Sequence, residues 1–461
     1  MPLQNTLRHA GAAARRWVSR RRLRVCFAVV VALCSGVLGF AALTGSTTAT
    51  AEAVPEAPPT EHHTVVTESA RYGTIIAYAP DGSVDYYNNS HAKYFDVDPV
   101  ENASMTVEYT AVETLVTESE RCGDPPCTRN VIERANLSTG EVTEVVARYD
   151  YREIAGEWHD HVRVNGTHVV VADMADDQVF MLDTETGVRE WAWNAQSEFP
   201  VEGGGHYPGD WTHLNDVSVL DDGRVMVSLR NQDQVAFIDP ETGLNASWTL
   251  GGDGNHATMY EQHNPDYIPE ESGGPAVVVA DSENGRVEEF QREAGEWVRT
   301  WEWSDARMQW PRDADRLPGG NTLVTDTNGG RVLEVDRGGE VVWSVELSHP
   351  YDAERLETGD ESAGGESARS LGLKSQSRGS GGGQGYDFRG FGPVVSLLRD
   401  LTPPRVVNAV IYVSPTWIGP AEIGPTVVGV ATGVTWAGLE GWWFVRSRDV
   451  GVRSPVYRKE E

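Results

Sequence analysis

The sequence predicts an all-β protein: a six-bladed β-propeller with four-stranded blades, flanked by N- and C-terminal transmembrane helices. Short segments of alternating hydrophobicity recur through residues 61–356, and turns rich in Gly, Asp, Pro and Asn separate them. The 461 residues include 48 Gly and 15 Trp, and long helical periods are scarce, which favours many short strands. Both ends of the chain carry an apolar segment beside a group of arginines.

The charge balance limits the possible partners. The chain has 69 Asp and Glu against 38 Lys and Arg, a formal charge of −31, and only three of its bases are Lys. A broad basic surface for nucleic acid is therefore excluded, because each phosphate contact needs a neutralising cation. The composition is typical of an extreme halophile, in which hydrated carboxylates keep a protein soluble in strong salt.

The N-terminal end begins with a basic tail, residues 1–24, that contains seven Arg and no acidic residue. Residues 25–45 follow without a charge, and this length is enough to cross a bilayer core of about 30 Å. Ser19–Arg24 is similar to a twin-arginine export signal. We favour a membrane anchor over a cleaved signal, because the apolar run exceeds the roughly 7–15 residues of a usual signal core. Residues 46–60 then form a linker.

The C-terminal end is organised in the same way. Residues 357–400 form a Gly/Ser-rich linker that we expect to be too polar to bury. Residues 401–444 form a C-terminal membrane segment, whose best single span, Ile423–Phe444, is interrupted by Glu440. A basic tail, 445–461, ends the chain. Basic residues at both outer ends place the termini in the cytoplasm, so we expect the propeller outside the cell, anchored to the cell membrane.

Two cysteines stand apart from the apolar ends. Cys122 and Cys127 flank the turn sequence Gly-Asp-Pro-Pro, and outside the cell they are expected to form a disulfide that closes this loop. Two free thiols are the alternative. We expect no metal site, because no second Cys/His pair with ligand spacing lies nearby.

The middle of the chain repeats a hairpin that ends at tryptophan. Val179–Gly187 leads to Trp191, Val235–Gly243 leads to Trp248, and other hairpins follow the same pattern. Another strand pair precedes each hairpin, so that each unit contains four strands, as a propeller blade does. The first strand of each unit opens with an Asp or Asn, which we expect to cap a turn. These residues are Asp96, Asp160, Asn215, Asn264, Asp313 and Asp352.

The two ends of the repeat predict how the ring closes. The last opening strand, residues 351–356, has no further strands after it, and the first strands, 64–69 and 73–78, have no opening strand before them. We therefore expect one blade to be shared, with its innermost strand from the C-terminal end and its outer three from the N-terminal end. Closure of this kind removes open sheet edges.

The innermost strands of a propeller line its channel, so the residues that open them should converge. His159 and His263 stand directly before two of the ring residues, and Arg312 stands before a third. His213 lies nearby, and Arg230 ends the second strand of its unit. Each histidine alone reads as a hydrogen-bonded polar residue at the start of a strand. Three imidazoles and an arginine at one mouth indicate a site for a small anion.

The residues around this mouth resemble the arylsulfotransferase family. The resemblance rests on Asp210-Trp-Thr-His-Leu-Asn-Asp-Val, Ser228-Leu-Arg230, Trp248–Gly252 and Gln262-His-Asn264, and it covers roughly residues 150–356. That family moves sulfuryl groups between phenols without a nucleotide sulfate donor, in the channel of a six-bladed propeller. The resemblance implies an aryl sulfate and a phenol as partners and no cofactor. With the acidic composition, it points to a haloarchaeal, membrane-anchored form.

The resemblance also implies roles for individual residues. His263 corresponds to the family's transiently sulfated histidine, and His213, Asn215 and Arg230 match its sulfate-binding residues. His159 matches a further family histidine less closely, with His161 as the fallback. Elementary chemistry agrees, because a neutral imidazole is a good nucleophile and a guanidinium binds sulfonate oxygens in pairs. A second histidine can protonate the leaving phenolate. We add Arg312 as a substrate-binding residue.

Two other functions compete with a sulfotransferase that works by a ping-pong mechanism through a sulfohistidine. One is a non-catalytic cell-surface propeller that binds a ligand or a protein partner, because the same fold serves many functions. The other, a quinone-dependent dehydrogenase, would require more blades, a tryptophan docking repeat in every unit and a Ca²⁺ site. The sequence does not indicate the natural donor, the acceptor or the oligomeric state.

Overall fold

The computed structural model describes residues 19–44, 50–69, 73–151, 156–377, 404–414 and 420–447. Most of both predicted basic tails lies outside the described residues. The chain divides into two compact units, which we describe separately. One consists of residues 46–387 and 402–416, and the other of residues 1–45, 388–401 and 417–461.

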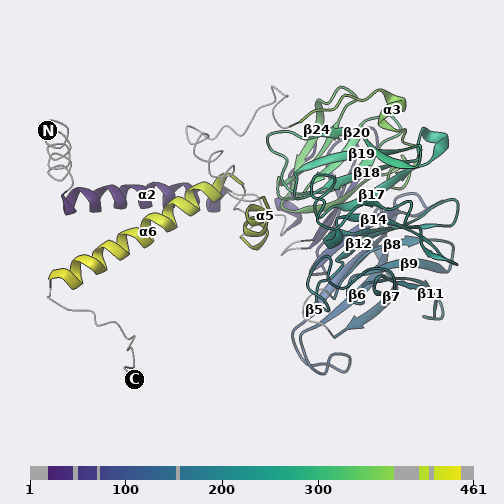
Figure 1. The fold of residues 1–461 in the computed structure, drawn as a ribbon, viewed down its shortest axis with the longest axis horizontal. Coiled ribbons are helices and arrows are strands. Elements are labelled where there is room, and N and C mark those ends of the chain that lie inside the picture. The colour runs from purple at the N-terminus through teal and green to yellow at the C-terminus, as the bar shows by residue number, and fades with distance from the viewer. Residues whose placement is uncertain are drawn as a thin grey trace, which may run out of the picture. The chain divides into compact units, whose positions relative to one another are not determined.

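The first unit is an all-β propeller of six antiparallel sheets, as the sequence predicts (Figure 1). Five sheets have four strands, and in the sixth the outermost position is divided between two short strands. The first two blades along the chain contain β4 (Lys93–Pro99), β5 (Thr106–Leu115), β6 (Cys127–Asn136), β7 (Glu141–Asp150), β8 (Trp158–Arg163), β9 (His168–Asp173), β10 (Gln178–Asp183) and β11 (Arg189–Asn194). The next contains β12 (Leu214–Val219), β13 (Val225–Leu229), β14 (Gln234–Asp239), β15 (Gly243–Leu244) and β16 (Leu250–Gly251). Two more contain β17 (His263–Ile268), β18 (Ala276–Asp281), β19 (Arg286–Glu293), β20 (Glu296–Trp303), β21 (Pro311–Arg316), β22 (Thr322–Asp326), β23 (Arg331–Val335) and β24 (Val341–Glu346).

The sixth blade joins the two ends of the repeat, and this confirms the predicted closure. Its order is β25 (Pro350–Arg355), β1 (Thr64–Glu68), β2 (Thr74–Tyr78) and β3 (Val84–Asn88). Strand β25 pairs antiparallel with β1, with Val66 opposite Ala353 and Thr67 opposite Asp352. The C-terminal strand is therefore innermost, and the ring has no open edge at the point where the chain begins and ends it.

Apolar side chains pack between neighbouring blades rather than within one sheet. Val66 and Ile76 of the shared blade form one cluster with Leu323, Val332 and Trp343 of the blade before it. Their neighbours Val65 and Ile75 lie on the opposite face, as the two-residue period of a strand requires, and pack against the next blade. The contacts between sheets hold the inner strands at a fixed spacing around the channel.

The innermost strands contain β-bulges, and these correct the predicted ring. In β12 the register skips from Leu214 to Asp216, so Asn215 lies in the bulge, as His159 does in β8. In β17 it skips from His263 to Asp266. Asp216 and Asp266 therefore take the places that the sequence analysis gave to Asn215 and Asn264. The error arose because an Asn precedes each of these two aspartates, and only the pairing partner shows which residues lie in the bulge.

The beginning of the predicted linker is also corrected, because residues 357–377 pack on the propeller. The short helix α3 (Ala368–Leu371) follows Ser367, which is fully buried. The backbone N–H of Ala368 donates to the Glu289 carboxylate at 2.8 Å. Polar residues can be buried here because their hydrogen-bonding groups find partners in the blade.

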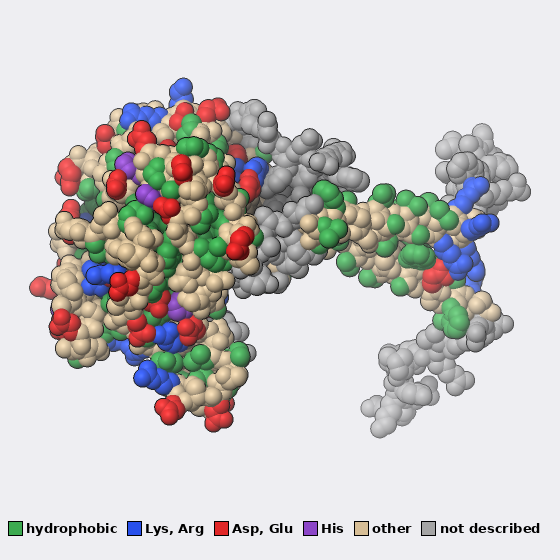
Figure 2. Space-filling view, turned by 180° about the vertical axis from the view of Figure 1, so that it is seen from behind, with side chains coloured by type: hydrophobic (Ala, Val, Ile, Leu, Met, Phe, Trp, Pro, Cys, Tyr) green, Lys and Arg blue, Asp and Glu red, His purple; other side chains and the backbone are tan. Residues whose placement is uncertain are grey.

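The second unit contains helices α2 (Arg20–Thr44) and α6 (Pro420–Ser447), which pack on each other. Within the described residues, one helix, Arg20–Leu43, is long and apolar enough to cross a membrane. The C-terminal span predicted at residues 401–444 is not shown by this criterion. Within this unit, Glu440 of α6 forms an ion pair with Arg24 of α2, and the Nη2 atom of Arg24 lies 2.6 Å from the Oε2 atom of Glu440. Figure 2 shows apolar side chains along this unit and basic ones gathered at one end.

Two further features belong to the propeller unit. Cys122 and Cys127 are joined by a disulfide. Helix α5 (Pro404–Val413), which falls in the predicted membrane segment, belongs to the compact unit of the propeller. Its Val407, Asn408 and Ile411 are buried.

Candidate functional site

Three imidazoles from separate blades meet at one mouth of the channel. The ring of His159 in β8 lies 5.1 Å from that of His213, centroid to centroid, and His213 lies 6.4 Å from His263. His213 directly precedes β12, and His263 begins β17. The structure therefore brings together three side chains that are about fifty residues apart in the sequence, as the sequence analysis expects.

The hydrogen bonds of His263 define its tautomer. Its Nδ1 atom lies 2.9 Å from the Ser282 hydroxyl oxygen and 3.2 Å from the carbonyl oxygen of Glu261. The Ser282 hydroxyl donates its own proton to the carbonyl of Pro311 at 2.7 Å, and carbonyls only accept. The proton between His263 and its neighbours must therefore be on Nδ1. The Nε2 atom is left with its lone pair, buried and without a hydrogen-bond partner among the described residues.

The surroundings of His263 favour the neutral imidazole. The residue is fully buried. Burial, followed by the positive charges of Arg312 and Arg230, lowers the pKa of His263 well below its ordinary value. A neutral ring with a bare Nε2 lone pair is the form of histidine that acts as a nucleophile.

His213 forms a carboxylate–imidazole pair. Its Nδ1 atom lies 2.7 Å from the Asp210 carboxylate, and its backbone φ of +48° lies in the left-handed region. Burial and the charge of Arg230 lower the pKa of His213, although Asp210 opposes them. Burial raises the pKa of Asp210, but His213 and Arg230 outweigh this effect and keep it below its ordinary value. When Nε2 of His213 carries a proton, the Asp210 carboxylate can therefore balance the charge of the imidazolium.

His159 lies between aromatic side chains. Its ring stacks on Phe95 at 4.3 Å, and its Nδ1 atom lies 3.0 Å from the Tyr351 hydroxyl. Burial, then the charges of His213 and Arg312, lowers the pKa of His159 well below its ordinary value. This imidazole is therefore neutral in an apolar, aromatic setting.

Two arginines serve the site in different ways. Arg230 donates to Glu261 at 2.6 Å, so its charge is compensated. Arg312 is 4% exposed, and no carboxylate among the described residues lies within ion-pairing distance of it. Its guanidinium lies 4.1 Å from the ring centroid of Trp310 and 5.1 Å from that of Tyr351. A buried, uncompensated guanidinium is an attractive place for an anion.

Helix α5 packs against residues of this mouth. Arg405 pairs with Glu261 at 2.9 Å, the same carboxylate that binds Arg230. Asn408 donates to Glu283 at 2.8 Å and accepts a hydrogen bond from Gln309. Tyr412 places its ring 5.5 Å from that of Trp310, which in turn lies 6.1 Å from that of His263. The phenol ring of Tyr412 therefore contacts Trp310, which in turn contacts His263.

Two predicted residues lie outside this cluster. Asn215 donates to the backbone carbonyl of Gln262 at 3.0 Å, a bond between neighbouring blades. His161 lies 3.3 Å from Asp96 and 3.4 Å from Glu108, and its Nδ1 atom lies 3.0 Å from the Thr110 hydroxyl. It faces carboxylates of the channel instead of the other imidazoles, so the fallback role for His161 has no geometric support.

Several side chains of the mouth were not assigned a role from the sequence. Asp210 stands three residues before its partner His213, and that spacing was a usable signal. Glu261 and Ser282 reach the site only through the fold, since each contacts a residue of another strand or loop. Tyr412 lies in an apolar run that reads as a membrane segment, so nothing in the sequence suggested its position.

Among the described residues, the groups with metal-ligand spacing do not include His159, His213 or His263. Three of these groups lie in the channel and consist of carboxylates, in one case with His161. The fourth lies on the outer strands of one blade and consists of His168, Asp183 and Glu190. The imidazole cluster therefore has the character of an anion site, with two guanidiniums beside it, and the acidic groups are a separate feature.

Comparison with known families supports the chemistry suggested by this geometry. Residues 142–348 match the model of the arylsulfotransferase (ASST) family. The match covers just under half of the chain and includes His159, His213, Arg230, His263 and Arg312. No curated protein matches the chain in sequence.

Solved structures with a similar fold are distant in sequence. A protein of unknown function from Bacteroides caccae is 11% identical, with a TM-score of 0.43 over 62% of this chain and 94% of its own. A periplasmic gluconolactonase from Pseudomonas aeruginosa is 13% identical, with a TM-score of 0.42 over 64% of this chain and 99% of its own. Virginiamycin B lyase from Staphylococcus aureus is 10% identical, with a TM-score of 0.32 over 51% and 73%.

Proposed function

We propose that the protein is an aryl-sulfate sulfotransferase that works by a ping-pong mechanism through a sulfohistidine at His263. The observation that carries the proposal is the Nε2 atom of His263. It is buried, has no hydrogen-bond partner in the described part of the chain, and has its lone pair free because Nδ1 holds the proton. The family match over residues 142–348 supports sulfuryl transfer as the chemistry.

Binding of the donor uses the uncompensated positive charge. The sulfate group of an aryl sulfate is an anion, and the Arg312 guanidinium can donate two parallel hydrogen bonds to its oxygens. Arg230 contributes a second guanidinium beside the imidazoles while it remains paired with Glu261. Trp310 and Tyr351, which flank Arg312, offer flat apolar surfaces for the aryl ring.

In the first half-reaction, Nε2 of His263 attacks the sulfur atom and the bond from sulfur to the phenolic oxygen breaks. The electron pair of that bond leaves with the phenolate, which takes a proton from His213 and departs as a phenol. The anionic donor offsets the charge of Arg230, which otherwise lowers the pKa of His213, so donor binding favours the protonated form. Asp210 balances its charge.

In the second half-reaction the acceptor phenol reverses these steps. Nε2 of His213 removes the phenolic proton, the phenolate oxygen attacks sulfur, and the bond from sulfur to His263 breaks. His263 returns to its neutral form, and His213 retains the proton for the next cycle. As in phosphoryl transfer, most of the catalytic effect comes from placement and from stabilisation of the charge on the transferred group.

We also propose that helix α2 anchors the protein in the cell membrane and that the propeller lies on the outer side. The apolar length of Arg20–Leu43 and the arginines at its start support this arrangement. A retained anchor would keep the enzyme beside phenols and sulfate esters that arrive from outside the cell.

Transfer of sulfate from an aryl sulfate to a phenol, measured in high salt, tests the proposal. We expect wild-type protein to transfer sulfate and His263→Ala to show no transfer above background. His206→Ala is the matched control, because His206 is exposed on a surface loop, and it should keep wild-type activity. Equal transfer by wild type and His263→Ala would overturn the proposal in favour of a propeller that only binds its ligand.

A further inference from the structure

The channel beyond the imidazole cluster is lined by carboxylates. Six aspartates form a ring, one from the inner strand of each blade, and five further acids extend it. The ring consists of Asp96, Asp160, Asp216, Asp266, Asp313 and Asp352, and the others are Asp98, Asp315, Glu354, Asp360 and Glu361. Within the described residues, one basic side chain, His161, lies within ion-pairing distance of any of them.

Several of these carboxylate oxygens lack a partner although they are buried. Asp315 is 1% exposed, and neither of its carboxylate oxygens accepts a hydrogen bond from a described residue. Asp216 is 6% exposed, and its Oδ1 atom also has no partner within the residues that the structure describes. A buried carboxylate without a partner is costly, and so the channel must hold protons or a cation.

Carboxylate oxygens from different strands converge in the channel. One ligand oxygen from each of Asp266, Asp315 and Glu361 can be chosen so that all three lie within 4.8 Å of one another. Asp96 and Asp352 form a second such group with Glu361. Glu361 belongs to the segment after β25, where its backbone φ of +50° and a hydrogen bond from its N–H to Glu354 at 2.8 Å hold it.

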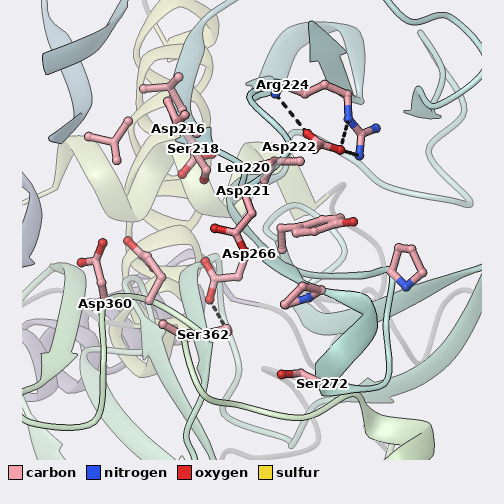
Figure 3. Close-up of a pocket in the computed structure, with 18 of the residues that line it drawn as sticks. Asp216, Ser218, Leu220, Asp221, Asp222, Arg224, Asp266, Ser272, Asp360 and Ser362 are labelled. Atoms are coloured by element: carbon pink, nitrogen blue, oxygen red, sulfur yellow. Dashed lines mark hydrogen bonds and ion pairs between the residues drawn. The ribbon is translucent and has the colours of Figure 1, made fainter. Parts of the chain in front are cut away.

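A cavity of about 750 Å³ adjoins these groups. Figure 3 shows Asp216, Asp266 and Asp360 around it, with Ser362 bonded to Asp266. Ser362 also accepts a hydrogen bond from the Arg316 N–H at 2.7 Å, so its proton points to Asp266 and that oxygen acts as an acceptor. The cavity has room for the water molecules that complete the coordination of a hard cation.

We propose that Asp266, Asp315 and Glu361 bind a hard divalent cation, Ca²⁺, in the channel, and that Asp96 and Asp352 extend the site. Ca²⁺ takes six to eight oxygen ligands in irregular geometry, which suits carboxylates from several strands together with cavity water. Bound there, the ion links the blades of β17, β21 and β25 and offsets their mutual repulsion. The site departs from the metal-free protein that the sequence predicts, and it does not depend on the proposed sulfotransferase activity.

The raised pKa values of these carboxyl groups agree with this geometry. Burial and neighbouring carboxylates raise the pKa of Asp216 and Asp315 well above the ordinary value, and burial raises that of Asp266 to about 7. In the absence of a cation, Asp266 would therefore take up a proton near neutral pH. Calcium and protons therefore compete for the same oxygens.

The test is metal analysis and thermal unfolding of the full chain. Protein treated with a chelator is dialysed into high salt of constant ionic strength without or with Ca²⁺, Mg²⁺ or extra K⁺. We expect calcium to remain bound after dialysis and Tm to rise with Ca²⁺ concentration, with less effect from Mg²⁺ and none from K⁺. A Tm that is the same with chelator and with Ca²⁺, and no retained calcium, would overturn the proposal and leave protons as the counter-charge.

A pair of isosteric variants locates the site. We expect Asp315→Asn to weaken calcium binding by about tenfold or more, because one charged ligand is lost. Asp221→Asn makes the same change at an exposed residue of the same cavity that belongs to no ligand group, and it should bind calcium like the wild type. Equal weakening in both variants would show diffuse charge attraction and contradict the assigned ligands. If Asp315→Asn does not fold, the wild-type calcium titration still decides.

Discussion

The Nδ1 atom of His263 lies 2.9 Å from the hydroxyl oxygen of Ser282. Because that hydroxyl gives its proton to a backbone carbonyl, it can only accept from the imidazole. This hydrogen bond, together with the contact to the Glu261 carbonyl, places the proton of His263 on Nδ1 and leaves Nε2 with its lone pair. The proposed nucleophile is prepared by its neighbours before any substrate arrives.

Ser282→Ala tests this relationship. The variant removes one of two acceptors for the Nδ1 proton, so we expect kcat to fall about tenfold, the equivalent of one hydrogen bond of about 1.4 kcal/mol, with KM little changed. Steady-state kinetics measure both constants. Ser282→Thr keeps the hydroxyl and should restore most of kcat; if it is as slow as Ser282→Ala, packing and not the hydrogen bond is responsible.

The pH dependence follows from the lowered pKa of His263. The neutral ring is the active form, and a lower pKa means that it persists to lower pH. We therefore expect the acid limb of kcat/KM below the ordinary imidazole value of about 6.5. Removing the positive charge of Arg312 removes one cause of the shift, so the acid limb of Arg312→Gln should move to higher pH. An unchanged limb would contradict this electrostatic link.

Arg312 and Arg230 are expected to contribute unequally to kcat/KM. Within the described ranges Arg312 has no carboxylate partner and can direct its full charge at the sulfate, whereas Arg230 is paired with Glu261. We expect Arg312→Ala to lower kcat/KM by about 100-fold, since hydrogen bonds to charged groups contribute about 1.5–3 kcal/mol, and Arg230→Ala to lower it less. Arg312→Lys keeps the charge without the paired donors and should fall between wild type and Arg312→Ala.

Helix α5 is expected to restrict access to the imidazoles. Asn408 is its most connected residue, since it contacts Glu283, Gln309 and Asn328. In Asn408→Ala we expect a lower KM for bulky aryl sulfates and little change for small ones, because the helix can move away from the mouth more easily. Competition between a bulky and a small donor measures this preference. A uniform loss of activity with both donors would instead indicate that α5 completes the site.

The sequence predicted the architecture well, because a propeller repeats its signals. Hairpin turns, the tryptophans that end the hairpins and the incomplete units at the two ends together predicted six blades and their closure. The error at Asn215 and Asn264 arose at the bulges, which insert residues where the inner strands enter the channel. No periodicity in the sequence reveals such an insertion, because it depends on the pairing partner.

The site was predicted less completely than the fold. The sequence could predict the residues that lie at the ends of strands sharing one mouth of the channel. These are His159, His213, His263, Arg230 and Arg312. Helix α5 was missed because its run of valines reads as lipid-facing, although Arg405 and Asn408 within it are signs of protein contact. The acidic channel was also missed, since each aspartate alone reads as a turn residue and only the fold brings them together.

The most direct test of the central claim is to treat the protein with an aryl sulfate in the absence of acceptor and to measure its intact mass and modified peptide. The account predicts a mass gain of one SO₃ group on His263, lost when a phenol is added and absent in His263→Ala. Release of phenol from the donor, together with no such adduct or with an adduct on another residue, would contradict the assignment of His263 as the nucleophile.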